Sequence, residues 1–270
     1  MKNILILTAN TGGGHNSAAN ALKSYTDKYK CNLNVSVVEY YKYIDPQLSK
    51  LSSTTYEICA KNLPHLYKAS YNIKNLTPNK ESKFSRPILN MKLKGLIKEY
   101  KPDIIVCLHP TITPEIVNLK KHNNYSYAVF VLMTDFDFHE GWLYPDVNLY
   151  IVSNNFMKLR LLEKKVPEDK VYCYGIPTSY KFLEKKEQKE VREELGLIDM
   201  TTVLLMGGSF GAGKIEKIFK KILNSSLDIQ IVAIAGKDMS LKKELLKLSS
   251  KYNKPVQIIG FTDKVYLYMD

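Results

Sequence analysis

Three consecutive glycines and a histidine, at residues 12–15, follow a short aliphatic run at 4–7. A run that is apolar at every position is typical of a parallel strand covered on both faces, and glycines let the backbone turn tightly and approach a ligand. A helix that starts after such a loop offers free N–H groups to an anion. His15 stands at that point, and its imidazole is a candidate general base. The alternative interpretation is a tight turn followed by a surface histidine.

The residues after His15 predict the helix that must hold it in place. Apolar side chains recur every three or four positions and give this helix one buried stripe, formed by Ala18, Ala21, Leu22, Tyr25 and Tyr29. Asn16 or Ser17 is of the residue types that cap a helix N-terminus, so we expect the helix to begin there. Ligands of open α/β sheets bind at the carboxyl ends of the strands, which is where Gly13, Gly14 and His15 are expected.

Two further histidines follow predicted strands and are candidates to line the same edge of the sheet. His109 comes after a strand expected at 104–108, and His139 follows a strand expected at 128–132. Asp135 stands between that second strand and His139. Polar and titratable residues thus gather at strand ends, although a histidine in such a place is also commonly a loop or packing residue.

A second glycine-rich loop, at 207–213, follows another apolar run and precedes a helix predicted at 215–223. Its GxxxxGK spacing, which ends at Lys214, matches the start of the phosphate-binding loop of nucleoside triphosphatases. Ile215 stands where that loop needs a Ser or Thr hydroxyl for Mg²⁺, so we do not expect this class. Neither glycine loop has the GxGxxG pattern with an acidic residue about twenty positions later, which argues against a dinucleotide oxidoreductase.

Alternating strand and helix patterns predict an α/β fold with two Rossmann-like domains. Further strands are expected at 149–152, 171–174, 203–206, 229–235 and 256–259. A charged segment at 184–195 predicts a linker or the first helix of the second half. We therefore expect domains at 1–178 and 179–270, each opening on a glycine loop, with the two facing across a cleft.

The composition indicates a globular protein with an anionic partner. Of 270 residues, 45% are hydrophobic and 24% are charged, and the formal net charge is +12. No segment approaches the ~18 apolar residues of a membrane helix, and the first apolar run is too short for a signal peptide, so we expect a cytoplasmic protein. The four cysteines lack metal-ligand spacing, and no metal site is expected.

Two thirds of the net charge of +12 comes from Lys61 to Lys98, where nine basic residues accompany one acidic residue, Glu81, and give +8. Interleaved apolar and aromatic residues make this stretch suitable for an anionic membrane surface. The basic residues expected to face the membrane are Lys74, Lys80, Lys83 and Arg86. Single-stranded nucleic acid is a second partner that such a surface fits. A third interpretation is a solvated, lysine-rich loop and helix pair that packs its own apolar face.

Five short motifs occur in order along the chain. They are TGGGH at 11–15, PDIIV at 102–106, TDF at 134–136 with His139 and Trp142, GIP at 175–177, and GFTD at 260–263. In residues and spacing they resemble the monogalactosyldiacylglycerol synthase and processive diacylglycerol glucosyltransferase family. GGSFGA at 207–212 also looks like the glycine loop of the related transferase that adds N-acetylglucosamine to the lipid-linked peptidoglycan precursor. The likeness spans nearly the whole chain.

The resemblance implies a GT-B fold and an inverting transfer of a hexose from a UDP-sugar to diacylglycerol or a glycosyl-diacylglycerol, without a cofactor or required metal. It implies that His15 lies at the reaction centre. The expected donor-binding residues are Gly14, Gly208, Ser209 and Phe261, and the expected acceptor or cleft residues are Gly13, Asp135 and His139. On this view nucleic acid is not a partner, and the protein associates peripherally with the cytoplasmic face of the membrane.

The C-terminus departs from the family pattern. Family members continue beyond the position of Asp270 through a strand and a glycine-rich turn into a helix whose glutamate helps to hold the donor. The second domain is therefore expected to be incomplete. The alternative function is a truncated, non-catalytic remnant that binds lipid or nucleotide without turnover.

Overall fold

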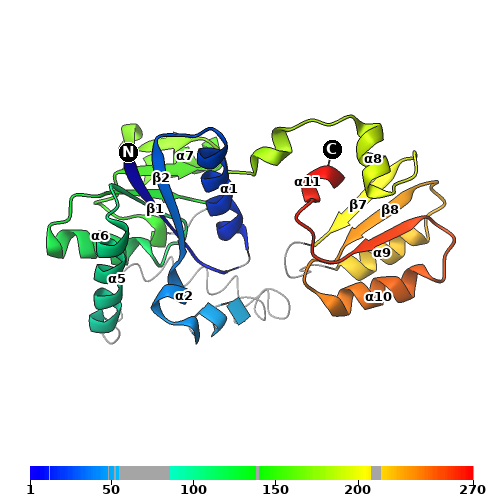
Figure 1. Ribbon diagram of the computed structural model, residues 1–270, viewed down its shortest axis with the longest axis horizontal. Helices are drawn as coiled ribbons and strands as arrows, with labels where there is room; N and C mark the ends of the chain where they lie inside the picture. The colour runs from blue at the N-terminus through cyan, green and yellow to red at the C-terminus, as the bar shows by residue number, and fades with distance from the viewer. Residues whose placement is uncertain are drawn as a thin grey trace. The chain divides into compact units, whose positions relative to one another are not determined.

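The computed structural model describes residues 1–11, 13–47, 49–51, 53–54, 86–137, 140–207 and 214–269, and for 86–88 it describes the backbone alone. The chain divides into two compact units, Met1–Tyr180 and Lys181–Asp270, and each is an α/β structure (Figure 1). The domain boundary expected from the sequence follows residue 178.

Within its described residues, the first unit has one sheet of six parallel strands in the order β2-β1-β3-β4-β5-β6. The strands are β1 (Lys2–Thr8), β2 (Leu33–Glu39), β3 (Ile104–Cys107), β4 (Ala128–Leu132), β5 (Leu149–Val152) and β6 (Val171–Cys173). The strand order reverses between β1 and β3. Doubly wound sheets bind ligands at the carboxyl side of such a reversal, so the ends of β1 and β3 mark the expected site.

Helices cover both faces of this sheet (Figure 1). They are α1 (Gly14–Lys28), α2 (Tyr40–Ile44), α5 (Arg86–Tyr100), α6 (Thr113–Asn123) and α7 (Asn155–Glu163), with short 3-10 turns at Glu140–Trp142 and Glu168–Lys170. A further 3-10 turn, Tyr180–Leu183, crosses the boundary between the units. Alternate residues of β1 point to opposite faces. Leu5 and Leu7 join the core beneath α5, α6 and α7, whereas Ile6 packs with Ala18 and Ala19 of α1. The continuous apolar runs of the sequence are explained by this burial on both faces.

The first helix begins at Gly14, so the expected start at Asn16 or Ser17 is wrong. Gly13 is the N-cap residue, and its φ of 83° is a left-handed conformation that glycine adopts without strain. Ser17 lies inside the helix, because its N–H donates to the Gly13 carbonyl at 3.0 Å. The Asn16 side chain instead accepts a hydrogen bond from Thr8 Oγ1 at 2.9 Å, which ties the helix to the end of β1.

The second unit contains, among its described residues, a parallel sheet in the order β7-β8-β9, formed by Thr202–Met206, Gln230–Ile234 and Val256–Ile259. Its core against α9 (Ile215–Leu223) and α10 (Met239–Ser249) is centred on Phe219 and Ile231. A second cluster joins α8 (Gln188–Leu195) to α11 (Val265–Tyr268) (Figure 1). Helices therefore cover both faces, as in a Rossmann-like domain.

Four predicted elements are confirmed with the same bounds, namely β4, β5, β9 and α9. The charged segment expected from residue 184 becomes α8 only at Gln188. Val191 and Leu195 provide the buried stripe of this helix, and short helices depend on such packing more than on intrinsic propensity.

The two cores predict that damage to one unit leaves the other folded. Phe219 is fully buried in the second unit, and Phe219→Ala should lower that unit's free energy of unfolding by about 3–5 kcal/mol. Trp142, the single tryptophan of the sequence, is fully buried in the first unit, so its fluorescence follows that unit alone. In urea titrations, far-UV circular dichroism should show that the second unit of the variant unfolds at a lower urea concentration. The unfolding midpoint of the first unit, followed by Trp142 fluorescence, should stay unchanged. An equal shift of both signals would contradict two separate cores.

Candidate active site

The carboxyl ends of three adjacent strands bring two histidines and a threonine together. His15 follows β1, His109 follows β3 and Thr134 follows β4, in the strand order β1-β3-β4. Thr134 Oγ1 lies 2.9 Å from His15 Nδ1, which is hydrogen-bond distance. The His15 and His109 rings meet edge to face, with centroids 5.2 Å apart. Residues distant in the sequence thus form one polar cluster at the expected ligand edge.

His109 is held from its far side by a short hydrogen-bonded chain. Its Nδ1 lies 2.7 Å from Thr111 Oγ1, which in turn lies 2.7 Å from the Tyr41 hydroxyl on α2. The Thr111 backbone N–H donates to the same Nδ1 at 3.3 Å. A backbone N–H only donates, so this contact favours the tautomer of neutral His109 that carries its proton on Nε2. The ring that faces His15 therefore has a fixed orientation.

Burial keeps the His15 imidazole uncharged at neutral pH. Desolvation lowers the pKa of His15 from 6.5 to about 4, although a hydrogen bond with the backbone of Leu108 partly opposes the shift. Burial disfavours the imidazolium because the charge loses its hydration. The neutral ring keeps one nitrogen unprotonated over the whole physiological pH range, and that nitrogen is able to accept a proton.

The glycines before His15 leave the approach to the ring open. Gly13 makes the left-handed turn, and Gly14 begins α1 at an exposed position. A Cβ built on Gly14 meets no described atom within 4 Å. Packing within the unit does not require a glycine there, whereas close approach of a ligand to the helix N-terminus does.

Asp135 lies directly after Thr134 on the loop that follows β4. Ser153 Oγ donates to the Asp135 carbonyl at 2.7 Å, which fastens this loop to the end of β5. Desolvation and, secondly, the Asp137 carboxylate raise the pKa of Asp135. The structure thus brings Gly13, Gly14, His15 and Asp135 to one edge of the sheet. His139, the remaining predicted residue of this edge, lies outside the described residues.

In the second unit, the turns after β8 and β9 lie side by side. Ala235 N–H donates to the Ile259 carbonyl at 2.8 Å, and a Cβ on Gly260 would lie 3.8 Å from the Gly236 oxygen and from Lys242 Nζ. Lys237 Nζ lies 5.3 Å from the centre of the Phe261 ring, which is two-thirds exposed. Two ammonium groups therefore flank the strand-end turn that contains the predicted donor residue Phe261, a charge arrangement that suits an anion.

The second glycine loop is only partly described. Gly208 and Ser209, predicted to bind the donor, lie outside the described residues. Ile215, the first residue of α9, is buried in the core with Phe219. A side chain that points into the core cannot assist a magnesium ion, which agrees with the sequence argument against a nucleoside triphosphatase. Among the described residues, no group of three or more His, Cys, Asp and Glu side chains is placed to hold a metal ion.

The basic stretch is described only from residue 86 onwards. Lys74, Lys80 and Lys83 lie outside the described residues, and Arg86 begins α5 with its side chain outside them. On α5 the residues exposed to solvent include Lys92, Lys94 and Lys98, whereas Leu93, Leu96 and Ile97 are buried. This helix therefore packs its own apolar face beneath solvated lysines. No helix in the described ranges is long and apolar enough to cross a bilayer.

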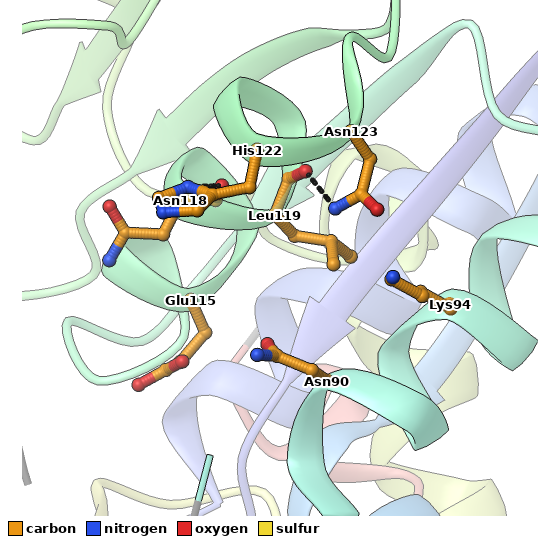
Figure 2. A pocket seen from close by; sticks show the side chains of 7 residues that line it. All are labelled: Asn90, Lys94, Glu115, Asn118, Leu119, His122 and Asn123. Carbon is orange, nitrogen blue, oxygen red and sulfur yellow. Dashed lines mark hydrogen bonds between the residues drawn. The ribbon is translucent and has the colours of Figure 1, made fainter. Parts of the chain in front are cut away.

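A separate polar hollow of about 380 Å³ lies between α5 and α6. Figure 2 shows its lining residues, which are Asn90, Lys94, Glu115, Asn118, Leu119, His122 and Asn123. The His122 Nδ1 lies 2.9 Å from the Asn118 carbonyl, and Asn123 Nδ2 donates to the Leu119 carbonyl at 2.9 Å. These side chains bond to carbonyls of their own helix. None of the predicted site residues lines the hollow.

The family model for monogalactosyldiacylglycerol (MGDG) synthase matches residues 15–178 of the sequence. That segment is more than half of the chain and contains the polar cluster of His15, His109 and Thr134. The chain belongs to this family.

Two similar proteins are processive diacylglycerol beta-glucosyltransferases. The protein from Bacillus licheniformis is 27% identical over 266 residues, which cover 98% of this chain and 69% of the relative. The protein from Staphylococcus epidermidis is 29% identical over 274 residues, which cover 99% and 68%. The family expected from the five sequence motifs is therefore confirmed.

Solved structures confirm the expected GT-B fold class. Anabaena HepE, in a crystal structure with UDP and glucose, matches all of this chain and 72% of its own, with a TM-score of 0.57 and 12% identity. MurG of Acinetobacter baumannii matches with a TM-score of 0.55 and 12% identity, covering 99% and 69%. A UDP-GlcNAc 2-epimerase from Neisseria meningitidis has a TM-score of 0.56 at 16% identity. The fold is shared by different reactions and does not by itself select one.

Three residues, one at the strand ends of the first unit and two at those of the second, had no role in the sequence-based prediction. Thr134 was part of a motif, but its partner His15 is 119 positions away, and only the strand order reveals their contact. Lys237 comes after the strand predicted at 229–235, separated from it by Gly236, and this place at a strand end is the signal by which the sequence could have identified it. Lys242 lies within α10 and has no signal in the sequence; its Nζ lies 3.8 Å from the position that a Cβ on Gly260 would take.

The lowered pKa of His15 predicts a specific pH dependence of stability. Between about pH 6.5 and 4 the unfolded chain binds a proton at this ring and the folded chain does not, so stability falls as the pH falls through this window. The shift corresponds to about 3 kcal/mol at most. His15→Asn cannot titrate, so wild type should lose more unfolding free energy than this variant between pH 7 and 4.5 in urea titrations. Equal losses, or an imidazole that titrates near pH 6.5 by NMR, would contradict a desolvated ring.

Proposed function

We propose that this chain transfers a hexose from a UDP-sugar to the hydroxyl of diacylglycerol or a glycosyl-diacylglycerol, with inversion. The observation that carries the proposal is the His15 cluster at the carboxyl edge of the first sheet, within the segment that matches the family. The relatives from Bacillus licheniformis and Staphylococcus epidermidis are named for such a transfer, from which the lipid acceptor is inferred.

In the proposed reaction, His15 acts as the general base. As the acceptor oxygen bonds to the anomeric carbon, the bond from that carbon to the diphosphate breaks on the opposite face, and the hydroxyl proton passes to the imidazole. A base within hydrogen-bond reach of a lipid hydroxyl contributes ~10²–10⁴ in rate. Thr134 fixes the orientation of the ring through Nδ1. A pKa of about 4 makes a weak base, and the approach of an anionic donor would raise it by favouring the imidazolium.

In the same proposal, the second unit holds the donor. The leaving diphosphate gains negative charge as the bond breaks, and preorganised positive groups stabilise that charge. Lys237 and Lys242 beside the exposed Phe261 supply two ammonium groups. Gly14, Gly208 and Ser209 are proposed to add backbone N–H groups, and Gly13, Asp135 and His139 to border the acceptor. These charges are proposed to take the place of a metal or cofactor, so activity should survive chelation by EDTA.

The transfer should be measurable with radiolabelled UDP-glucose or UDP-galactose and diacylglycerol vesicles. His15→Ala should lower kcat by ~10² or more with little change in KM for the donor, because a base acts in the transition state. The matched control is His122→Ala, on the hollow between α5 and α6, which should retain wild-type rates. An unchanged kcat together with a raised KM for the donor would show that His15 contributes to donor binding and is not the general base.

Since the chain spans 68–69% of these two relatives, the assay needs two reference proteins. One is the Bacillus licheniformis relative cut to the matching segment, and the other is this chain fused to the remaining part of that relative. Product from the fusion supports the proposal even where both short chains are inactive. A folded fusion that makes no product would contradict the enzymatic function and leave a non-catalytic lipid- or nucleotide-binding remnant.

We also propose that the stretch from Lys61 to Lys98 attaches the protein peripherally to anionic lipid at the cytoplasmic face of the membrane. The support is its net charge of +8, from nine basic residues and one acidic residue. Each basic residue near an anionic surface contributes ~1 kcal/mol, and salt screens this attraction. In the described part of the stretch, Leu93, Leu96 and Ile97 of α5 are buried and Met91 is exposed, so the proposal rests on charge rather than insertion.

Replacing Lys74, Lys80, Lys83 and Arg86 by Glu should therefore abolish most binding to anionic vesicles at low salt, measured by co-sedimentation. The matched control reverses four exposed lysines of the second unit, Lys220, Lys221, Lys243 and Lys247. That control should change binding much less. Equal losses of vesicle binding in the two variants would mean that binding depends only on the total charge of the protein. Retention on single-stranded oligonucleotides that vesicles do not compete away would instead favour nucleic acid.

A further inference from the structure

The first unit has another hollow, of about 440 Å³, whose chemistry differs from that of the polar hollow between α5 and α6. Its lining residues are Leu143, Tyr144, Pro145, Val147, Tyr150, Lys164, Lys165, Val166, Pro167 and Lys170. Apart from the three lysines, these residues are aliphatic, aromatic or proline, and none of them carries a carboxylate. Because the segments that form it lie at the amino ends of β5 and β6, we call it the amino-edge hollow.

Two proline turns fix the walls of the amino-edge hollow. Pro145 lies in a turn closed by the Val147 N–H, which donates to the Tyr144 carbonyl at 3.3 Å. Pro167 precedes a 3-10 turn, in which the Lys170 N–H donates to the Pro167 carbonyl at 3.1 Å. Proline restricts the backbone before any ligand arrives. Binding to walls of this kind costs little ordering entropy.

Hydrogen bonds connect these walls to the sheet and to each other. The hydroxyl of Tyr150, on β5, donates to the Tyr144 carbonyl at 3.0 Å and accepts from the Tyr144 N–H at 2.9 Å. Lys170 Nζ donates to the Val147 carbonyl at 3.3 Å, which joins the segment before β6 to the segment before β5. The buried Tyr150 hydroxyl is thus already paired, and the apolar lining is held in one arrangement.

Three ammonium groups border the amino-edge hollow, and they differ in how they are engaged. Lys164 Nζ pairs with Glu140 at 2.6 Å, and both side chains are more than one-third exposed, so this ion pair is weak. Lys170 uses one of its three N–H donors on the Val147 carbonyl. Lys165 forms no ion pair with any described residue. The hollow therefore carries positive charge that its own residues do not neutralise.

The alternative role of Lys164 and Lys165 is to stabilise the carbonyls at the end of α7, which basic side chains commonly do. Backbone groups already bond to these carbonyls. The Lys165 N–H donates to the Leu162 carbonyl at 2.8 Å, and the Val166 N–H donates to the Leu161 carbonyl at 3.1 Å. The ammonium groups are therefore not required for closing this helix.

We propose that the amino-edge hollow binds a soluble organic anion, whose aromatic or aliphatic body fills the hollow and whose phosphate or carboxylate is held by the three lysines. Charge complementarity identifies the ligand as an anion, and the apolar lining distinguishes it from an inorganic ion. Pockets of roughly 300–1,000 Å³, mainly apolar with a few polar groups, are typical of small-molecule sites.

This site is separate from the one proposed for sugar transfer. His15 lies at the carboxyl edge of the sheet, and the four residues of β5 alone span roughly 13 Å between the two edges. A ligand in the amino-edge hollow therefore does not reach the His15 cluster. The inference does not rest on the proposed function, and its test needs no turnover.

The test is isothermal titration calorimetry of the full chain with 1-naphthyl phosphate, which has an aromatic body and one phosphate. This probe should bind about tenfold or more tightly than inorganic phosphate or 1-naphthol, because each of those supplies only part of the ligand. Lys165→Gln combined with Lys170→Gln should weaken its binding about tenfold or more, since two charge-assisted contacts are lost. The matched control is Lys30→Gln with Lys101→Gln. These two lysines have left-handed conformations, as Lys165 does, but do not line the hollow.

Because Lys170 also joins the two walls, Lys165→Glu provides a second variant, which should weaken binding about tenfold without changing the urea midpoint of the first unit. Wild-type affinity in both variants, or an equal loss in the control, would overturn the proposal. Equal affinity for inorganic phosphate would overturn it as well, since the apolar lining would then not be used.

Competition by UDP shows which unit holds the probe. UDP should not displace 1-naphthyl phosphate, because the proposed donor groups Lys237 and Lys242 belong to the second unit. Displacement would place the probe at those lysines and overturn the proposal. Binding that is lost in the Lys165 variants supports the hollow even where the fusion protein transfers no sugar, so the two proposals fail separately.

Discussion

The hydrogen bond between His15 and Thr134 joins residues 119 positions apart, and it exists only because β1, β3 and β4 are neighbours in a parallel sheet. All three strands end at the same edge, and the segments that follow them must share the same space. β1 ends at Thr8, and Gly13 in its left-handed conformation is the N-cap of α1, so His15 lies in the first turn of the helix. Moving the ring by one turn, a rise of about 5 Å, would separate it from Thr134.

The position of the ring also determines its protonation. Packing against the strand ends takes the imidazole out of water, and the resulting pKa of about 4 keeps it neutral. A neutral imidazole can be fixed by the Thr134 hydroxyl and by an edge contact with His109 without the repulsion that two imidazolium ions would cause. Burial therefore lowers the basicity of the imidazole but gives it one defined orientation, and a group proposed to accept a proton depends on that orientation as well as on its basicity.

The sequence predicts those parts of the structure that follow from local physics. Strands β4 and β5 were found with correct bounds because each is a continuous apolar run, and parallel strands are buried on both faces. The start of α1 was missed because capping rules favour Asn16 or Ser17, whereas a glycine in a left-handed conformation set the start at Gly14. The partnership of His15 with Thr134, and the approach of Lys242 to Gly260, depend on strand order and on packing between turns, which a single sequence does not encode locally.

The fold leaves several reactions open, since a UDP-GlcNAc 2-epimerase shares it with sugar transferases, and the choice must come from the groups at the strand ends. In the first unit these are the uncharged imidazole of His15 with Thr134, the carboxyl group of Asp135, whose pKa is raised by desolvation, and the exposed side chains of Phe136 and Phe156. In the second unit they are the ammonium groups of Lys237 and Lys242. A partly apolar edge with an uncharged imidazole suits a neutral lipid hydroxyl, and a cationic edge suits a diphosphate that gains charge as it leaves. Such a division of polarity between the units is what transfer from a charged donor to an uncharged acceptor requires, because each substrate is matched where its own charge is stabilised.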